Sequence, residues 1–265
     1  MKGERLLVWT EQGLGDAVMM MRYLPRLRGC GAGSIVVQCQ PPLARCIEAM
    51  DVADEVRIAA EPPPPDAYDR HVPIMSLALL AGEAGRVIPN LPYLTVPRDD
   101  AERWSARLGA RERPRVGLAW AGSKALRDDA RRSVPLDAFA SLLNLKEIAW
   151  FSLQKDEGSD QCAAFGDLIR DWMPFSVDLL DTAALIHNLD LVISVDTVVA
   201  HVAGAIGKPV WMLNRFGSEW RWGLAGESTP WYPSMRILRQ PRAGDWSTVI
   251  GEVHASLQAL AGAGR

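Results

Sequence analysis

The stretch "DLVISVDTVVAHVAGAIGKPVWML" at residues 190–213 decides the fold of this chain. The apolar run at 191–195 is typical of a strand that is buried on both faces, as in parallel sheets. The segment 197–207 predicts a helix, and "PVWMLN" at 209–214 predicts the next strand. A strand, a helix and a second strand in this order form the repeating unit of a parallel α/β sheet.

Asp196 and Thr197 lie where the first of these strands passes into the helix. Ligands of open α/β sheets bind just outside the carboxyl ends of strands, and the positive end of a helix suits a phosphate or diphosphate. A negative Asp196 would repel a diphosphate, so we expect its carboxylate to bind hydroxyl groups such as those of a sugar. His201 shares a helix face with Thr197, one turn further on. The alternative, that Asp196 is only a helix N-cap and His201 a hydrogen-bonded core residue, stays open.

The same alternation runs through most of the chain and predicts an α/β fold. Strands are expected at 5–9, 34–40, 55–60, 147–154, 190–196 and 209–214, and at the start of 115–123. Helices are expected at 16–31 with a break at Pro25, and at 42–50, 75–84, within 101–114, and at 135–145, 159–171, 181–189 and 197–207. The proline-rich segment 61–73 predicts a rigid loop. The pattern restarts near residue 114, so we divide the chain into residues 1–110 and 111–265.

Composition excludes several classes of protein. The formal net charge of −3 over 265 residues lacks the basic excess of a nucleic-acid-binding surface. The four cysteines form neither a CxxC pair nor a metal-ligand spacing, which favours reduced thiols. No apolar run reaches the roughly 18 residues of a membrane span, and the charged start "MKGER" is not a signal peptide. These features predict a cytoplasmic protein.

The first strand leads into a glycine-rich turn, "GLGD" at 13–16. Gly13 and Gly15 allow the backbone to come close to a ligand or to take a positive φ. Asp16 stands in the first turn of the following helix, at the carboxyl end of the strand. It is either a capping carboxylate or an acid at the mouth of a cleft.

Three further segments carry candidate binding groups. The loop "AGSKALRDDARRSVP" at 121–135 could neutralise a leaving diphosphate, or be a solvated basic loop. "FSLQKDEG" at 151–158 puts an amide and charged groups at a strand end, where they could bind a ribose or a base, or form a polar turn. Aromatic side chains near the C-terminus could stack on a ring or pack a domain joint; they are Trp220, Trp222, Trp231 and Tyr232.

Together these motifs resemble glycosyltransferase family 9, the ADP-heptose:lipopolysaccharide heptosyltransferases and their relatives. The resemblance rests on "GLGDA" at 13–17, "WAGS" and "RRSVP" at 120–135, and "ISVDTVVAHVAGAIGKPVW" at 193–211. A branch often fused to tetratricopeptide repeats is more similar still, through "QPPL", "PIMSLAL", "SLQK", "DTAALI", "EWRW" and "PWYPSMRILRQPRAGDW". The family implies a GT-B architecture, in which two Rossmann-like domains with parallel sheets face each other across a cleft.

The resemblance also implies roles for particular residues. Asp16 would be the general base, and Arg132, which replaces the family's lysine, would bind phosphate. The C-terminal domain would hold the donor, and the N-terminal domain would present the acceptor. We assign the donor side to Ser123, Lys124, Arg132, Gln154, Lys155, Asp196, Thr197 and His201. We assign the acceptor side to Gly13, Gly15 and His71.

The predicted function is inverting, metal-independent glycosyl transfer, with no cofactor beyond the nucleotide-diphosphate sugar, for which ADP-heptose is favoured. A base on one domain and phosphate-binding groups on the other meet the needs of this chemistry. The acceptor is a surface glycan such as lipopolysaccharide core, a lipid-linked sugar or a protein. A lipid-linked acceptor would bring the protein to the inner face of the cytoplasmic membrane. The alternatives are an inactive sugar-nucleotide-binding module and a nucleotide-sugar epimerase.

Overall fold

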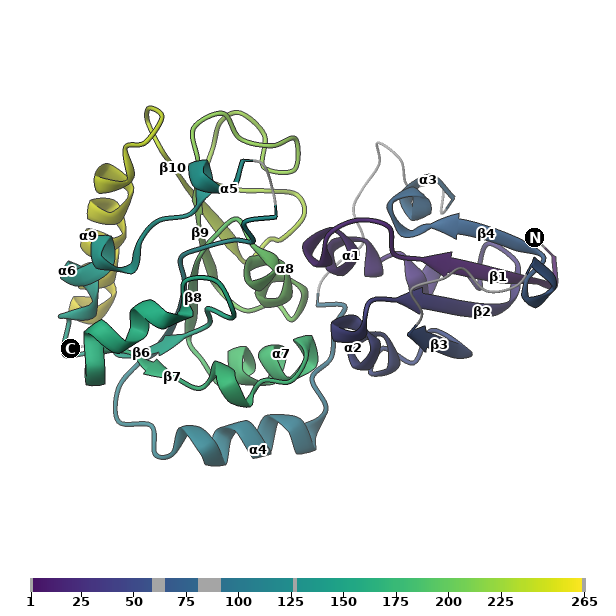
Figure 1. Cartoon of the computed structure of the whole chain (residues 1–265), viewed down its shortest axis with the longest axis horizontal. Helices are drawn as coiled ribbons and strands as arrows, with labels where there is room; N and C mark the ends of the chain where they lie inside the picture. The colour runs from purple at the N-terminus through teal and green to yellow at the C-terminus, as the bar shows by residue number, and fades with distance from the viewer. Residues whose placement is uncertain (1, 59–64, 81–91, 126–127, 264–265) are drawn as a thin grey trace.

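Two parallel sheets make up the fold of the chain (Figure 1). The computed structural model describes residues 2–58, 65–80, 92–125 and 128–263. The first sheet has the order β3-β2-β1-β4, from β1 (Glu4–Trp9), β2 (Ala32–Cys39), β3 (Glu55–Ile58) and β4 (Arg70–Pro73). The second has the order β10-β9-β8-β5-β6-β7, from β5 (Arg115–Ala119), β6 (Ala149–Ser152), β7 (Arg170–Asp171), β8 (Leu191–Val195), β9 (Val210–Asn214) and β10 (Met235–Arg239). The predicted α/β class with parallel sheets is confirmed.

Parallel strands need crossover connections, and most of the connections between these strands contain an α-helix. The helices are α1 (Leu14–Met21), α2 (Ala44–Glu48), α3 (Leu77–Leu80), α4 (Arg98–Leu108), α5 (Asp129–Arg132), α6 (Ala140–Leu143), α7 (Leu179–His187), α8 (Val198–Ala205) and α9 (Trp246–Ala263). Helix α1 ends at Met21, and a 3₁₀ turn with Pro25 follows, so the predicted break is confirmed. Of the helix expected at 75–84, residues 81–84 lie outside the described residues.

Several predicted elements are wrong or were missed. Part of the expected loop 61–73 forms β4, an edge strand paired in parallel with β1, where a terminal proline costs no ladder hydrogen bond. The expected α-helix at 159–171 is a 3₁₀ segment over 159–168, interrupted by Gly166 with φ +49°. Strand β10 and helix α9 were not predicted.

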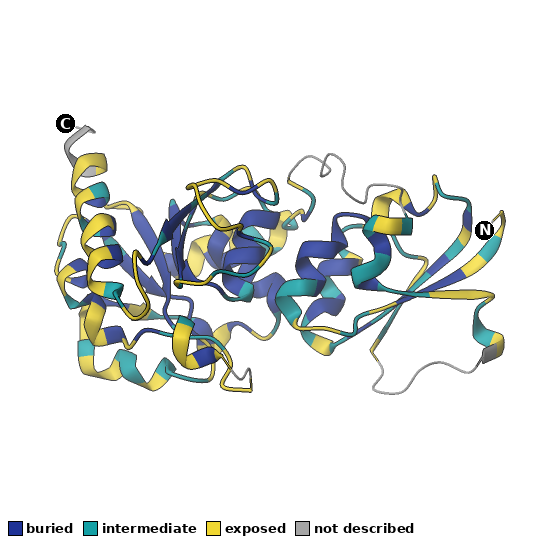
Figure 2. Ribbon diagram, turned by 90° about the horizontal axis from the view of Figure 1, so that it is seen from above, coloured by how far each residue is buried: buried dark blue, intermediate teal, exposed yellow. Residues whose placement is uncertain are grey.

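One continuous core joins the two halves of the chain. Apolar side chains of β1 and α1 pack in the same cluster as those of α7 and α8. In Figure 2 much of the ribbon between the two sheets has the dark blue of buried residues. A second cluster fills the far face of the second sheet, beneath α6 and α9. Because α1 begins at the carboxyl end of β1 and α8 at that of β8, this joint brings two strand ends together.

Helix α4 lies just before the predicted boundary at residue 110, yet it packs on α7 of the second half. Its Trp104 is 1% exposed, and the Asn188 side chain at the end of α7 donates to the carbonyl of Ala101, 2.9 Å away. The division into residues 1–110 and 111–265 stays a prediction. Among the described helices none is both long enough and apolar enough to cross a membrane.

Candidate functional site

The second sheet has a topological switch point between β5 and β8. From β5 the chain continues to β6 on one side, whereas β8 lies on the other side of β5. Crevices at such points, outside the carboxyl ends of the strands, are where open α/β sheets bind ligands. Arg132 ends the short helix α5 in the connection after β5, and Asp196 and Arg215 directly follow β8 and β9. These three segments therefore form the candidate site.

Thr197 begins helix α8. Its Oγ1 accepts a hydrogen bond from the Val199 N–H at 3.3 Å and lies 3.2 Å from the Ser194 hydroxyl. Thr197 is thus the N-cap, and the alternative that gave this role to Asp196 is wrong. Asp196 is 8% exposed, and burial raises the pKa of its carboxyl group. The neighbouring side chains of Trp222, Arg132 and Arg215 oppose that rise.

Arg132 ties the loop after β5 to the start of α8. Its Nε donates to Asp129 Oδ1 and its Nη1 to the backbone carbonyl of Asp196, each at 2.9 Å. A Cβ at Gly122 would stand no more than 2.5 Å from Arg132 Nη2 and from Asp129 Oδ1, so a larger residue there would displace this ion pair. The structure therefore brings together Arg132, Asp196 and Thr197, as the sequence predicts.

Arg215 was not predicted as a site residue. It directly follows β9, and its side chain is 11% exposed. Its guanidinium lies 3.2 Å from Asp128 Oδ2 and 3.8 Å from Glu219 Oε1. The rule that placed Asp196 at a strand end applies equally to Arg215, so the sequence did carry the signal.

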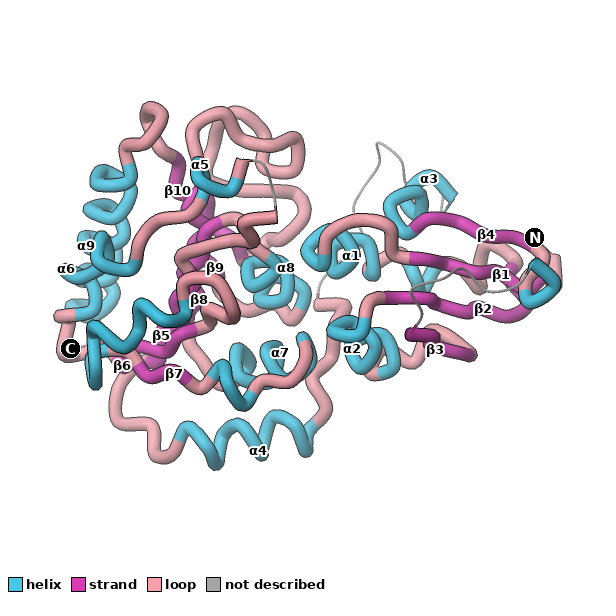
Figure 3. The backbone as a smooth tube through the Cα atoms, in the orientation of Figure 1, coloured by secondary structure: helices cyan, strands magenta, loops and turns pink. Residues whose placement is uncertain are grey.

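Asp16 stands in the first turn of α1 and forms an ion pair with Arg221 Nη2 from the other half of the chain. The two side chains are 18% and 14% exposed. Arg221 comes from the long connection between β9 and β10, residues 215–234, which contains no helix or strand (Figure 3). No local sequence pattern links residues 16 and 221, so this pair could not be predicted.

His201 is a buried, hydrogen-bonded residue. Its Nδ1 lies 2.9 Å from the hydroxyl oxygen of Tyr232, and the Trp222 ring centroid is 5.3 Å away. Burial, reinforced by the positive charge of Arg22, lowers the pKa of His201 to about 3. The imidazole is therefore neutral at physiological pH, as expected of a core residue at the joint.

Glycine at position 15 leaves room for the side chain of His201, which lies directly against it. A Cβ at residue 15 would stand 2.8 Å from the imidazole Cδ2. Neither Gly13, with φ −61°, nor Gly15 has a positive φ, so that part of the prediction is wrong. The close approach that Gly15 permits is between helix α1 and a side chain of α8.

The aromatic residues pack the joint, as one interpretation of the sequence predicts. Arg22 is 2% exposed, and its guanidinium carbon lies 4.8 Å from the Tyr93 ring, 5.4 Å from the Trp231 ring and 4.9 Å from the Tyr232 ring. Its Nη1 donates to the Trp231 carbonyl at 2.8 Å. Trp220 differs from the others, because 61% of it is exposed.

The other predicted residues lie apart from this cluster or serve the backbone. Gln154 is buried, and its side-chain amide bonds the backbone of Trp120, Ala121 and Glu157, so its role here is structural. Lys155 Nζ donates to the Ser176 carbonyl.

Ser123 and Lys124 are exposed, and the Lys124 backbone N–H donates to Glu157. His71 lies exposed on the edge strand β4, in an edge-to-face contact with Tyr68. Residues 126 and 127 of the predicted basic loop 121–135 lie outside the described residues.

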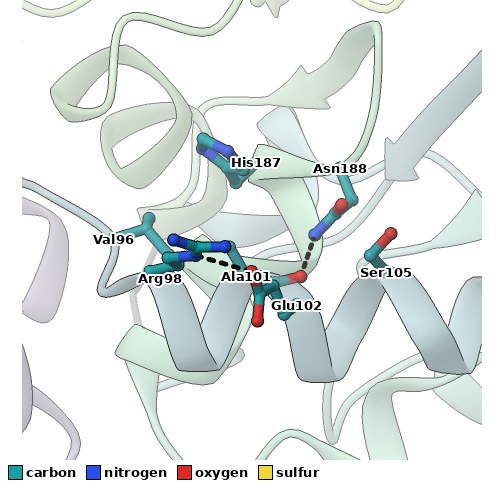
Figure 4. Close-up of a pocket in the computed structure, with 7 residues that line it drawn as sticks. All are labelled: Val96, Arg98, Ala101, Glu102, Ser105, His187 and Asn188. Atoms are coloured by element: carbon teal, nitrogen blue, oxygen red, sulfur yellow. Dashed lines mark hydrogen bonds and ion pairs between the residues drawn. The ribbon is translucent and has the colours of Figure 1, made fainter.

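An open pocket of about 380 Å³ lies between α4 and α7 (Figure 4). Its lining consists of Val96, Arg98, Ala101, Glu102, Ser105, His187 and Asn188. Arg98 is paired with Glu102 at 2.6 Å on the surface of α4. None of the predicted site residues belongs to this lining.

The chain has two parallel sheets with helices, and the sheets meet at the carboxyl ends of their strands. Basic and hydroxyl groups lie at the switch point of the second sheet. This arrangement is the predicted GT-B fold. Residues 176–245 match the model of glycosyltransferase family 9 (heptosyltransferase). The resemblance to that family is thereby confirmed, and the matched segment contains Asp196, Thr197, His201, Arg215 and Arg221.

The chain is similar to protein FlbA of Caulobacter vibrioides, with 30% identity over 285 residues and 98% of this chain. It spans about half the length of that relative (47%). Its fold matches E. coli ADP-heptose LPS heptosyltransferase II, with a TM-score of 0.64, 16% identity and 98% of each chain covered. It also matches the iron-containing heptosyltransferase TibC from enterotoxigenic E. coli, solved with ADP-D-β-D-heptose. That TM-score is 0.61, with 13% identity over 97% of this chain and 78% of the other. At these identities the solved structures establish the fold alone.

Proposed function

We propose that the chain is an inverting glycosyltransferase that moves a heptose-like sugar from a nucleoside-diphosphate sugar, ADP-heptose, to an acceptor hydroxyl. The observation that carries the proposal is the convergence of Arg132, Arg215 and the N-terminus of α8 at the switch point. Guanidinium groups and a helix N-terminus bind diphosphates strongly. The names of the relatives support heptose as the sugar.

The buried carboxyl group of Asp196 suits the donor sugar. It is close enough to Arg132 and Arg215 for their charges to act on its pKa. A carboxylate there would repel the diphosphate but accept hydrogen bonds from sugar hydroxyls. This arrangement would place the anomeric carbon of the donor sugar between its phosphates and the N-terminal half of the chain, which carries Asp16.

Asp16 would act as the base that accepts the proton of the attacking hydroxyl. In inverting transfer, the acceptor oxygen attacks the anomeric carbon on the face opposite the departing nucleoside diphosphate, which leaves with the electron pair of the broken bond. The basic groups at the switch point would stabilise that leaving group. The acceptor would be a surface glycan, a lipid-linked sugar or a protein, and a cytoplasmic location stays a prediction.

Metal independence is also part of the proposal. Across the described ranges, no cluster of three or more His, Cys, Asp or Glu side chains is spaced to hold a metal ion. A transfer assay with and without a chelator tests this, since TibC is described as iron-containing. Equal rates support metal independence, and loss of activity that added metal restores contradicts it.

The direct test is calorimetric titration of ADP and UDP into the wild-type chain and its Arg132→Met and Arg215→Met variants. Loss of one charge-assisted contact should weaken ADP binding about tenfold or more. Arg57→Met removes a guanidinium paired with Glu55 on the first sheet, and it should leave affinity unchanged. Equal affinities in all four proteins would place the diphosphate elsewhere.

A binding module without turnover is the second candidate. It is favoured by one observation, that Asp16 is paired with Arg221 instead of being free to take a proton. Nucleotide binding without transfer to any acceptor in a cell extract would support it. Analysis of the products formed from donor alone would reveal an epimerase.

A further inference from the structure

Arg221 is held between both halves of the chain. Its Nη2 contacts Asp16 Oδ1, its Nη1 contacts Glu219 Oε2, and its guanidinium lies 5.2 Å from the Trp220 ring centroid. Its Nε is buried and has no hydrogen-bond partner among the described residues. The guanidinium is thus fixed by two carboxylates, of which only Asp16 belongs to the first half.

These contacts belong to a longer row of alternating charges. Asp16 pairs with Arg221, Arg221 with Glu219, and Glu219 with Arg215 at 3.8 Å. Arg215 in turn pairs with Asp128 at 3.2 Å. The row therefore runs from the proposed base to the proposed phosphate site, and each arginine in it is shared by two carboxylates.

Such sharing has a consequence for Asp16. A carboxylate that holds a guanidinium is stabilised in its ionised form and is a poorer proton acceptor. A diphosphate that binds Arg215 would compete with Glu219 for that side chain. Glu219 would then be left with Arg221 alone, and the pull of Arg221 on Asp16 would weaken.

We propose that Arg221 is a positioning residue that holds Asp16 until a diphosphate binds at Arg215. This inference rests on the proposed function, because it takes the switch point as the diphosphate site. Arg221 would thereby link the two halves of the site, because Asp16 is released from its ion pair only when the donor is bound. Trp220, which covers the guanidinium, keeps Arg221 within reach of both carboxylates.

A double-mutant cycle on ADP affinity tests the proposal, with Kd measured by calorimetry at fixed pH and salt. Asp16→Asn removes the competitor for Arg221 and should tighten ADP binding about threefold or more. The same change in an Arg221→Met background should leave Kd unchanged. The control Glu11→Gln removes a neighbouring charge of the β1–α1 loop, one that bonds the Ile74 and Met75 N–H groups, and should not alter Kd.

Two further variants guard against simple misfolding. Arg221→Lys keeps the charge, and Asp16→Asn should again tighten ADP binding in that background. Glu219→Gln removes the carboxylate that pairs with both Arg221 and Arg215, so Asp16→Asn should then leave the Kd for ADP unchanged.

Equal tightening by Asp16→Asn with and without Arg221 would show a plain long-range charge effect and overturn the proposal. No tightening in the wild-type background would do the same. If the wild-type chain binds no ADP, the proposed function is contradicted and this inference falls with it.

Discussion

Gly15 of α1 lies directly against the imidazole of His201 on α8, so close that a Cβ at residue 15 would stand 2.8 Å from Cδ2 of the ring. The ring cannot give way easily, because Tyr232 bonds it on one side and Trp222 packs on it. This contact fixes the distance between the two helices that follow β1 and β8. The glycine of the "GLGD" turn thus sets the joint between the sheets.

Gly15→Ala should destabilise the chain by about 1–3 kcal/mol, because the added methyl overpacks a buried contact. The free energy of unfolding in urea measures this. Gly251→Ala is the matched control: Gly251 also lies in a helix, but nothing stands within 4 Å of its Cβ position. That variant should stabilise the chain by about 0.5–1 kcal/mol. Destabilisation of equal size at both positions would contradict the proposed contact.

His201 should make stability depend on pH in a defined direction. Its folded-state pKa of about 3 lies below its ordinary value of 6.5, so the unfolded chain takes up the proton first as pH falls. Stability contributed by the neutral ring is present above pH 6.5 and is lost as pH falls toward 3. Between pH 7 and pH 5, wild type should lose about 2 kcal/mol more than His201→Gln. Parallel losses in the two proteins would contradict a neutral, buried imidazole.

Arg22 should stabilise the joint in a way that lysine cannot reproduce. Its fork donates to the carbonyls of Met19 and Trp231, each at 2.8 Å, while its plane lies over aromatic rings. Arg22→Lys should cost about 2–3 kcal/mol, since a point charge cannot make both bonds. The exposed pair of Arg57 and Glu55 provides the comparison, and Arg57→Lys should change stability by less than about 0.5 kcal/mol.

Asp16→Asn should separate chemistry from binding. Loss of a general base is expected to slow transfer about 10²- to 10⁴-fold, while ADP still binds at least as tightly as to wild type. Single-turnover transfer and calorimetry on the same preparation measure the two effects. Transfer at the wild-type rate would remove Asp16 from the role of base.

The sequence predicted those features that depend on local pattern. Apolar runs ending in polar residues located β1, β5, β8 and β9, and the strand-end rule placed Asp196 and Thr197 at one edge of the sheet. Edge strand β4 was missed because its four residues follow a proline-rich segment and show no clear alternation.

Pairing between distant segments was the part that the sequence could not reveal. Asp16 and Arg221 are 205 residues apart, and their ion pair depends on how two sheets meet. Gln154 illustrates the reverse error: its place at a strand end suggested a ligand contact, but its amide is used by the backbone. The Gln154 oxygen accepts two backbone hydrogen bonds and its NH₂ group donates two, so its amide has no donor left for a ligand.

A crystal structure of the chain with ADP bound tests the central claim most directly. We expect the diphosphate at the switch point between β5 and β8, with phosphate oxygens about 3 Å from the guanidinium groups of Arg132 and Arg215 and facing the N-terminus of α8. ADP found elsewhere, as in the pocket between α4 and α7, with Arg132 and Arg215 still bound only to their present carboxylate and carbonyl partners, would contradict it.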